Sequence, residues 1–142
     1  MILCDVNIFV YAFRRDLPRH QAARAWLTET IHAPGAFGIS DLVSSAFLRI
    51  VTNSRIFQKR SETVDALGFL ATLRGRPNVV KVTPGKRHWS IFEGLCRGPE
   101  IHGDRIPDAW FAALAIESGS EWITTDRGFA RFPALRWRDP FD

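Results

Sequence analysis

Cysteine and histidine are scarce in this sequence. Its 142 residues include only two cysteines, Cys4 and Cys96, and both lie in apolar stretches. A disulfide framework is therefore not expected, and we interpret both thiols as small core hydrophobes in a reducing compartment. The four histidines are far apart along the chain and none is spaced to pair with a cysteine, which argues against a zinc site.

Long apolar runs and phosphate-binding glycine loops are also absent. No stretch approaches the ~18 apolar residues that span a membrane. The N-terminal apolar stretch is short and lacks the preceding basic region of a secretory signal. We therefore expect a cytoplasmic protein. Without a Walker-type loop or a Gly-x-Ser-x-Gly motif, nucleoside triphosphate hydrolysis and serine esterase chemistry are not leading functions.

Acidic residues are fewer than basic ones, 15 against 19, which gives a net charge of +4. Sixteen of the basic residues are arginines, whose planar guanidinium suits bidentate contacts to phosphate. The balance favours a nucleic-acid partner, although a solvated surface position is the more common role for any one arginine.

Apolar runs alternate with helical patterns along the whole chain. Strands are expected at Ile2–Asn7, Ala36–Ile39, Asn78–Thr83, Trp122–Thr125 and Leu135–Arg138. Helices are expected over Ile8–Phe13, His20–Ile31, Leu42–Thr52, Ser61–Arg74, Lys86–Arg97 and Asp108–Ser118. This alternation predicts an α/β fold with a mainly parallel sheet of four to five strands and helices on both faces. No linker or repeat divides the chain, so we expect one domain over residues 1–142.

Three aspartates are expected at one edge of this sheet. Asp5 and Asp126 end apolar strands, and Asp108 begins an alanine-rich helix. Right-handed crossovers place the carboxyl ends of parallel strands on the same edge, where ligands bind in open α/β sheets. Carboxylates gathered there repel one another and need a cation, and all-oxygen ligation suits Mg²⁺ or Mn²⁺. A metal held in this way can activate water for phosphodiester hydrolysis.

Each aspartate also has a structural interpretation. Asp108 follows Pro107 and is a favourable acid in the first turn of a helix. Asp126 could cap the turn that continues through Gly128. Asp5 has the weakest structural explanation, because an unpaired carboxylate inside an apolar strand costs several kcal/mol.

Four further polar residues are candidates around this site. Asn7 and Thr125 could hold the carboxylates in position by hydrogen bonds. Asp104 and Asp41 lie in a loop and at a helix start where they could face the same edge, although a solvated loop acid and a helix-start acid are the simpler interpretations. The arginines expected near this edge, some of which could hold an RNA backbone, are Arg14, Arg15, Arg49, Arg55, Arg105 and Arg127.

Four short motifs resemble one known family. They are Asp-Val-Asn at 5–7, Arg-Ile-Val-Thr-Asn at 49–53, Asp-Ala-Trp-Phe-Ala-Ala-Leu-Ala at 108–115 and Thr-Thr-Asp-Arg-Gly-Phe at 124–129. In this order and spacing they resemble PIN-domain ribonucleases, and more closely the mycobacterial-type VapC toxins of type II toxin–antitoxin modules. The stretch Phe-Pro-x-Leu-Arg-Trp-Arg at 132–138 is similar to that group as well.

The resemblance implies an α/β/α sandwich and a Mg²⁺- or Mn²⁺-dependent endoribonuclease that cuts RNA. It also implies a cognate VapB antitoxin and a homodimer. Asp5, Asp108 and Asp126 match three acids of the family, and Thr125 matches its hydroxyl before the last acid. Ala46 stands where a further acid is usual.

Because Ala46 carries no ligand, the resemblance leaves open whether one metal or two would bind, with Asp41 or Asp104 as the candidate substitute. The sequence also admits two other functions. A catalytically weakened RNA-binding module would follow from the missing acid. An aspartyl phosphatase using Asp5 is disfavoured because that chemistry prefers an acid where Asn7 stands.

Overall fold

The structure, a computed structural model, describes all 142 residues and contains five strands and six α-helices. The strands are β1 (Ile2–Cys4), β2 (Phe37–Ile39), β3 (Val79–Lys81), β4 (Glu121–Ile123) and β5 (Trp137–Arg138). The helices are α1 (Val6–Phe13), α2 (His20–His32), α3 (Asp41–Val51), α4 (Thr63–Arg74), α5 (His88–Cys96) and α6 (Arg105–Ser118), and a 3₁₀ helix, η1, covers Arg127–Arg131.

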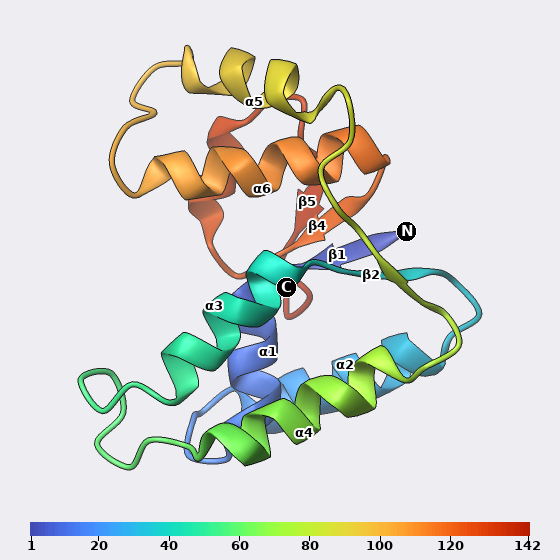
Figure 1. Cartoon of the computed structure of the whole chain (residues 1–142), viewed down its shortest axis with the longest axis vertical. Coiled ribbons are helices and arrows are strands. Elements are labelled where there is room, and N and C mark those ends of the chain that lie inside the picture. The colour runs from blue at the N-terminus through green and yellow to red at the C-terminus, as the bar shows by residue number, and fades with distance from the viewer.

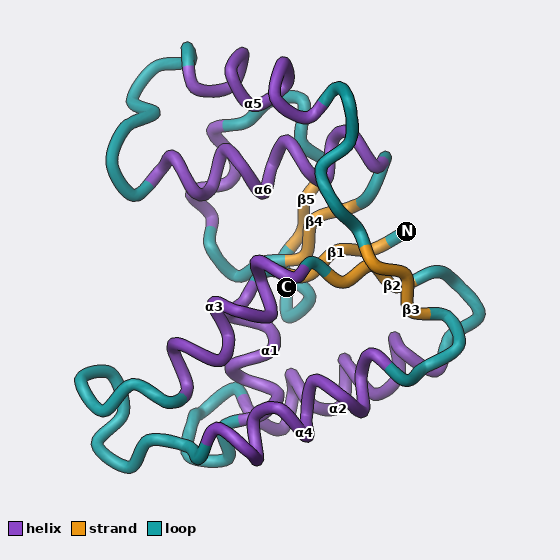
Figure 2. The backbone as a smooth tube through the Cα atoms, in the orientation of Figure 1, coloured by secondary structure: helices purple, strands orange, loops and turns teal.

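The strands form one sheet in the order β3-β2-β1-β4-β5, and every pairing is parallel. Helices α5 and α6 lie on one side of the sheet and α1 to α4 on the other (Figure 1). The tube in Figure 2 shows the short strands gathered between these two helical layers. This is the α/β/α arrangement that the alternation of strands and helices predicts, so the expected fold class is confirmed.

The first strand is the centre of the sheet. Ile2 is paired with Phe37 of β2 on one side and with Glu121 of β4 on the other. A strand with a neighbour on each side and helices over both faces must be apolar throughout, and Leu3 and Cys4 are accordingly buried within a core cluster of 27 residues. This position leaves only the carboxyl end of β1 free to carry polar groups.

Three differences between the observed and expected element boundaries matter for the site. Strand β1 ends at Cys4, because the Asp5 side chain accepts a hydrogen bond from Val6 N and starts α1 there. Helix α6 begins at Arg105, three residues before the expected start, with Pro107 inside its first turn, where its missing N–H is tolerated. Strand β4 ends at Ile123.

None of the helices combines the length and the apolar composition that crossing a membrane requires.

Candidate active site

Asp5 is the buried centre of the site. As the residue between β1 and α1 it is only 7% exposed, and its Oδ1 accepts a hydrogen bond from Val6 N at 2.7 Å. Its Oδ2 accepts a hydrogen bond from Thr124 Oγ1, also at 2.7 Å. The two bonds fix the carboxylate at the carboxyl end of the central strand.

Thr124, not Thr125, is the hydroxyl that orients Asp5. Thr124 is fully buried after β4, and its Oγ1 also accepts hydrogen bonds from Asn7 Nδ2 at 3.2 Å and from Asp126 N at 3.0 Å. Asn7 Nδ2 additionally contacts Asp5 Oδ2 at 3.3 Å. Asn7 therefore has the supporting position expected from the sequence, whereas the side chain of Thr125 makes no hydrogen bond. Because β4 ends at Ile123, two residues earlier than expected, the role belongs to Thr124.

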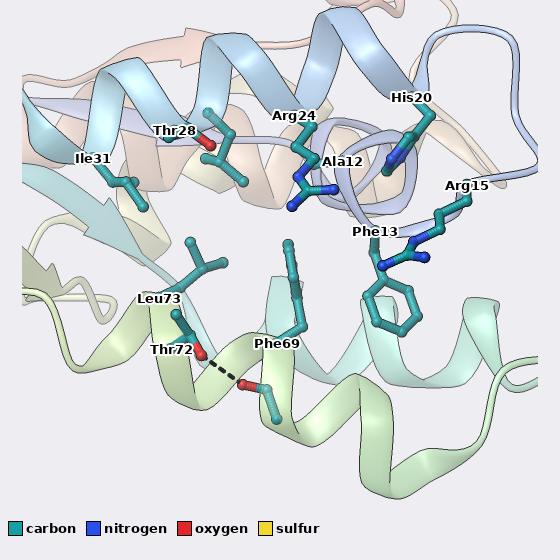
Figure 3. A pocket seen from close by; sticks show the side chains of 12 residues that line it. Ala12, Phe13, Arg15, His20, Arg24, Thr28, Ile31, Phe69, Thr72 and Leu73 are labelled. Carbon is teal, nitrogen blue, oxygen red and sulfur yellow. Dashed lines mark hydrogen bonds between the residues drawn. The ribbon is translucent and has the colours of Figure 1, made fainter.

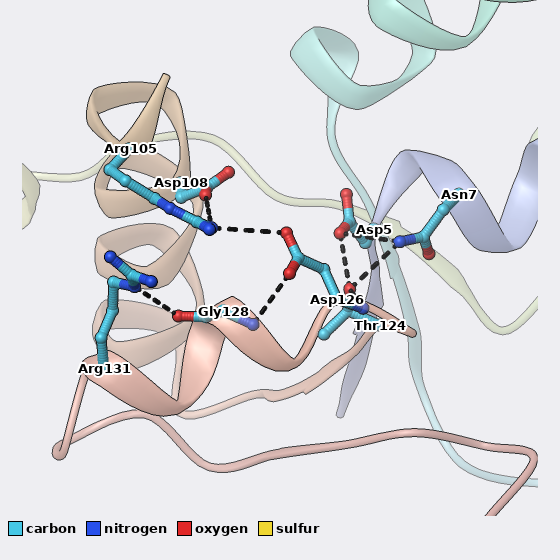
Figure 4. A network of polar contacts seen from close by, with 8 residues as sticks. All are labelled: Asp5, Asn7, Arg105, Asp108, Thr124, Asp126, Gly128 and Arg131. Atoms are coloured by element: carbon cyan, nitrogen blue, oxygen red, sulfur yellow. Dashed lines mark hydrogen bonds and ion pairs between the residues drawn. The ribbon is translucent and has the colours of Figure 1, made fainter. Parts of the chain in front are cut away.

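Asp108 and Asp126 are joined by an arginine. Arg105 Nη1 lies 2.9 Å from Asp108 Oδ2, one turn along α6, and 3.5 Å from Asp126 Oδ2. The other oxygen of Asp126 accepts a hydrogen bond from Gly128 N at 2.8 Å, which caps η1. Figure 4 shows Asp126 lying between the Arg105–Asp108 pair and the group formed by Asp5, Asn7 and Thr124. The three predicted aspartates thus share one edge of the sheet.

The carboxylates affect one another electrostatically. Burial raises the pKa of Asp5 to about 6; the hydrogen bond from Thr124 opposes this shift, and the charges of Asp108 and Asp126 reinforce it. Burial also raises the pKa of Asp108 above its ordinary value, while its contact with Arg105 acts in the opposite direction. The site therefore carries more negative charge than its own residues neutralise, which favours a cation.

The donor atoms fit a hard divalent cation by their chemistry. All three side chains offer carboxylate oxygens, and no thiol or imidazole lies among them, which suits Mg²⁺ or Mn²⁺ better than zinc. As the side chains stand, no three acidic, histidine or cysteine residues are close enough to enclose a metal ion. The guanidinium of Arg105 is the positive group between two of the carboxylates.

The remaining acidic candidates lie apart from this cluster. Asp41 begins α3 and pairs with Arg74 and with Lys81, the latter at 2.8 Å; the hydrogen bonds from Lys81 and Arg74 lower its pKa. Asp104 precedes α6 as an exposed residue without a capping hydrogen bond. Ala46 is half-buried on α3 and brings no polar atom. Neither Asp41 nor Asp104 contacts Asp5, Asp108 or Asp126 through a hydrogen bond or ion pair.

The arginines expected near the site have different roles. Arg14 is buried and binds Lys59 O at 2.7 Å, so it secures the connector between α3 and α4. Arg127 pairs with Asp142 at 2.6 Å. Arg49 and Arg55 are exposed and make no ion pair. Arg105 is therefore the one arginine of the set that touches the acidic residues.

A separate groove of about 370 Å³ lies between α2 and α4. Its floor is apolar, with Leu27 from α2 and Phe69 and Leu73 from α4, and Figure 3 shows these two helices on opposite sides of it. Arg15 and Arg24 lie along its margin (Figure 3). It has no residue in common with the acidic site.

Comparison with known proteins decides the family. The sequence profile of the PIN domain matches residues 2–135, nearly the whole chain. The chain belongs to the PIN-domain family. Ribonuclease VapC43 of Mycobacterium tuberculosis is 39% identical over 142 residues, covering 100% of this PIN domain chain and 97% of that protein. Ribonuclease VapC25 of the same species is 38% identical over 136 residues, 96% of each chain. The resemblance seen in the sequence is confirmed.

Solved structures agree with the fold. VapBC2 from Rickettsia felis, bound to a promoter DNA fragment, superposes with a TM-score of 0.65 at 18% identity, covering 98% of both chains. VapC20 of Mycobacterium tuberculosis, a toxin that cleaves the sarcin–ricin loop, superposes with a TM-score of 0.64 at 18% identity over 92% of this chain and 93% of the other. At these identities the likeness supports the shared architecture alone.

Proposed function

We propose that this PIN domain is a metal-dependent endoribonuclease, the toxin of a VapBC-type toxin–antitoxin module. The observation that carries the proposal is the convergence of Asp5, Asp108 and Asp126 on one edge of the sheet, in a chain whose full-length relatives are named VapC ribonucleases. Oxygen ligands of this kind are those that Mg²⁺ or Mn²⁺ takes at phosphoryl-transfer sites.

The residues have distinct parts in this chemistry. Asp5, Asp108 and Asp126 would hold the cation, and Thr124 and Asn7 keep the Asp5 carboxylate oriented. A divalent cation bound there supplies an activated water and stabilises the negative charge that grows on a phosphoryl oxygen. Exposed arginines such as Arg49 and Arg55 bind the RNA backbone, which gives affinity without sequence choice.

The test is cleavage of a pool of tRNA and rRNA by the purified protein, with Mg²⁺ or Mn²⁺ and then with EDTA. We expect discrete fragments only in the presence of metal. Asp5→Asn should abolish cleavage, and Asp65→Asn, an exposed acid on α4, should retain it. Sequencing the fragment ends would name the target. Cleavage that survives both EDTA and Asp5→Asn would refute the proposal.

The second function, an RNA-binding module with weakened catalysis, is favoured by one residue. Ala46 lacks the carboxylate that the family usually has at this place, so the metal would have one ligand fewer. This function predicts salt-sensitive RNA binding without metal-dependent fragments. The same incubation, accompanied by a filter-binding assay at low and high salt, separates the two functions.

We further propose that the groove between α2 and α4 binds an apolar, acidic segment of a VapB-type antitoxin. The apolar floor supplies burial, and Arg15 and Arg24 supply positive charge at its margin. Solved structures with this fold include VapBC complexes from Rickettsia felis and Haemophilus influenzae. A homodimer stays a prediction.

Charge reversal tests this docking site. Arg24→Glu should weaken binding of the cognate antitoxin by roughly tenfold or more, because a like charge would face the acidic segment. Arg97→Glu, directly after α5, is the matched control, since it lies outside the groove. Titration calorimetry gives the affinity, and both variants should still cleave RNA. Equal affinities for the two variants would place the antitoxin elsewhere.

A further inference from the structure

Arg105 is unusual among the arginines because it is surrounded by acids of the active site. A single nitrogen, Nη1, faces both Asp108 Oδ2 at 2.9 Å and Asp126 Oδ2 at 3.5 Å. An arginine that only stabilised a helix would pair with one acid of its own helix. This one also joins α6 to η1, two elements that carry different aspartates of the site (Figure 4).

The backbone of η1 leaves room for this guanidinium. A Cβ on Gly128 would lie 2.3 Å from Arg105 Nη1 and 2.8 Å from its Cζ, far closer than atoms can approach. Gly128 has no left-handed φ that would itself require glycine. A side chain at this position would therefore displace the guanidinium from its contact with the two acids.

The contact conflicts with metal binding. Metal-to-oxygen distances for Mg²⁺ are about 2.1 Å, so a cation coordinated by the two oxygens that face Arg105 Nη1, at 2.9 and 3.5 Å, would need the space that this nitrogen occupies. Two positive groups also repel each other when both lie between the same acids. Arg105 and a divalent cation therefore exclude each other from the contact with Asp108 and Asp126.

We propose that Arg105 is a built-in competitor of the metal: its guanidinium holds Asp108 and Asp126 together in the free protein and must leave them before a divalent cation binds. The proposal rests on the metal site of the proposed function. Arg105 is a positioning residue in this role, because it acts through the two carboxylates. Its presence lowers the affinity for metal and keeps the acids paired when metal is scarce.

Metal binding itself, and not cleavage, is the direct test. Mn²⁺ is titrated into the wild type, Arg105→Gln and Arg131→Gln, and the free Mn²⁺ is followed by electron paramagnetic resonance. Arg131 is the matched control because it carries the same charge near the site but donates only to Gly128 O, at 2.8 Å. We expect Arg105→Gln to bind Mn²⁺ roughly tenfold more tightly than wild type, and Arg131→Gln to change affinity by less than about threefold.

Thermal unfolding separates this role from a purely structural one. In EDTA, Arg105→Gln should be less stable than wild type because its two acids lose their partner, and Mn²⁺ should raise its midpoint more than that of wild type. Arg105→Lys keeps the charge without the planar guanidinium. Its stability in EDTA and the rise of its midpoint with Mn²⁺ should lie between those of wild type and Arg105→Gln, and it replaces Arg105→Gln in this test if that variant does not fold. A lower stability in EDTA with unchanged Mn²⁺ affinity would overturn the proposal.

The two proposals can fail separately. If Arg105→Gln binds Mn²⁺ more tightly than Arg131→Gln while no RNA is cut, the competition stands and the ribonuclease fails. If RNA is cut in a metal- and Asp5-dependent way while both variants bind Mn²⁺ equally, the ribonuclease stands and the competition fails.

Discussion

At the scale of single residues, Asp5 makes the free protein less stable than it could be. Burial raises its pKa to about 6 in the folded state, above the ~3.9 of an unfolded chain. The folded state therefore binds more protons between about pH 4 and pH 6, and stability is lost as the pH rises through this window. Above it, the charged carboxylate costs about 3 kcal/mol.

Asp5→Asn should remove this cost while abolishing cleavage. In EDTA, we expect the free energy of unfolding of the variant to exceed that of wild type by a margin that grows to about 3 kcal/mol from pH 4 to pH 7. Urea unfolding at several pH values measures the difference. Parallel pH profiles for the two proteins would show that Asp5 does not titrate in this way.

Gly128→Ala offers a second way to move Arg105. The added methyl group would take the space of the guanidinium, so the variant should bind Mn²⁺ more tightly, as Arg105→Gln does. Its stability in EDTA should change by no more than about 1 kcal/mol, because the arginine is partly exposed and can turn to solvent. Combined with Arg105→Gln, the substitution should add nothing to the Mn²⁺ affinity. Wild-type affinity in Gly128→Ala would argue against the competition.

Single residues of the site could be predicted from the sequence where a residue type has few structural explanations at its position. An acid inside an apolar strand pointed to Asp5, and the structure buries it as the centre of the site. Alternation along a strand does not show where the strand ends, so the supporting hydroxyl was assigned to Thr125 when Thr124 makes the contacts. The sequence offers two adjacent threonines before Asp126, and only the observed end of β4 at Ile123 decides between them.

At the scale of elements, the connector between α3 and α4 depends on one buried cation. Arg14 donates to Lys59 O at 2.7 Å and to Ser61 Oγ at 3.1 Å, pairs with Asp16, and lies over the ring of Phe57 at 4.0 Å. The connector has no regular secondary structure to hold it in place. Its conformation, and the exposed arginines that it carries, are therefore set by the end of α1.

Arg14→Ala should release this connector. We expect the free energy of unfolding to fall by about 3 kcal/mol, because several charge-assisted hydrogen bonds and a cation–π contact are lost from a buried position. Arg15→Ala, an exposed neighbour, should cost less than about 0.5 kcal/mol. Urea unfolding compares the two, and hydrogen exchange should show faster exchange of the amides in residues 53–61 of Arg14→Ala only. Similar losses in both variants would contradict this role.

Element boundaries explain what the sequence could not reveal about Arg105. Because proline favours the first helical position, Pro107 predicts a helix that begins beside Asp108, and Arg105 then precedes the expected helix, among the arginines that could hold RNA. In the structure α6 begins at Arg105, which puts it one turn before Asp108 and within its reach. Periodicity predicts that a helix exists more reliably than where it begins.

At the scale of the whole molecule, the sheet ties the two helical layers together. Strand β1 pairs with β2 on one side and β4 on the other, and Phe111 of α6 stacks on Trp122 of β4. We expect one cooperative unfolding transition, with the same urea midpoint by circular dichroism and by tryptophan fluorescence. Two midpoints would mean that the α1–α4 layer and the α5–α6 layer unfold independently, contrary to a single domain.

The position of the first strand at the centre of the sheet also determines when the site can form during translation. Asp5 leaves the ribosome early, but its partner Thr124 lies 119 residues later. At 5–20 residues per second, roughly 6–24 s pass between the translation of these two residues. Until β4 has emerged and paired with β1, the acids cannot meet. We therefore expect the acidic site, and any activity that depends on it, to form only when nearly all of the domain has been made.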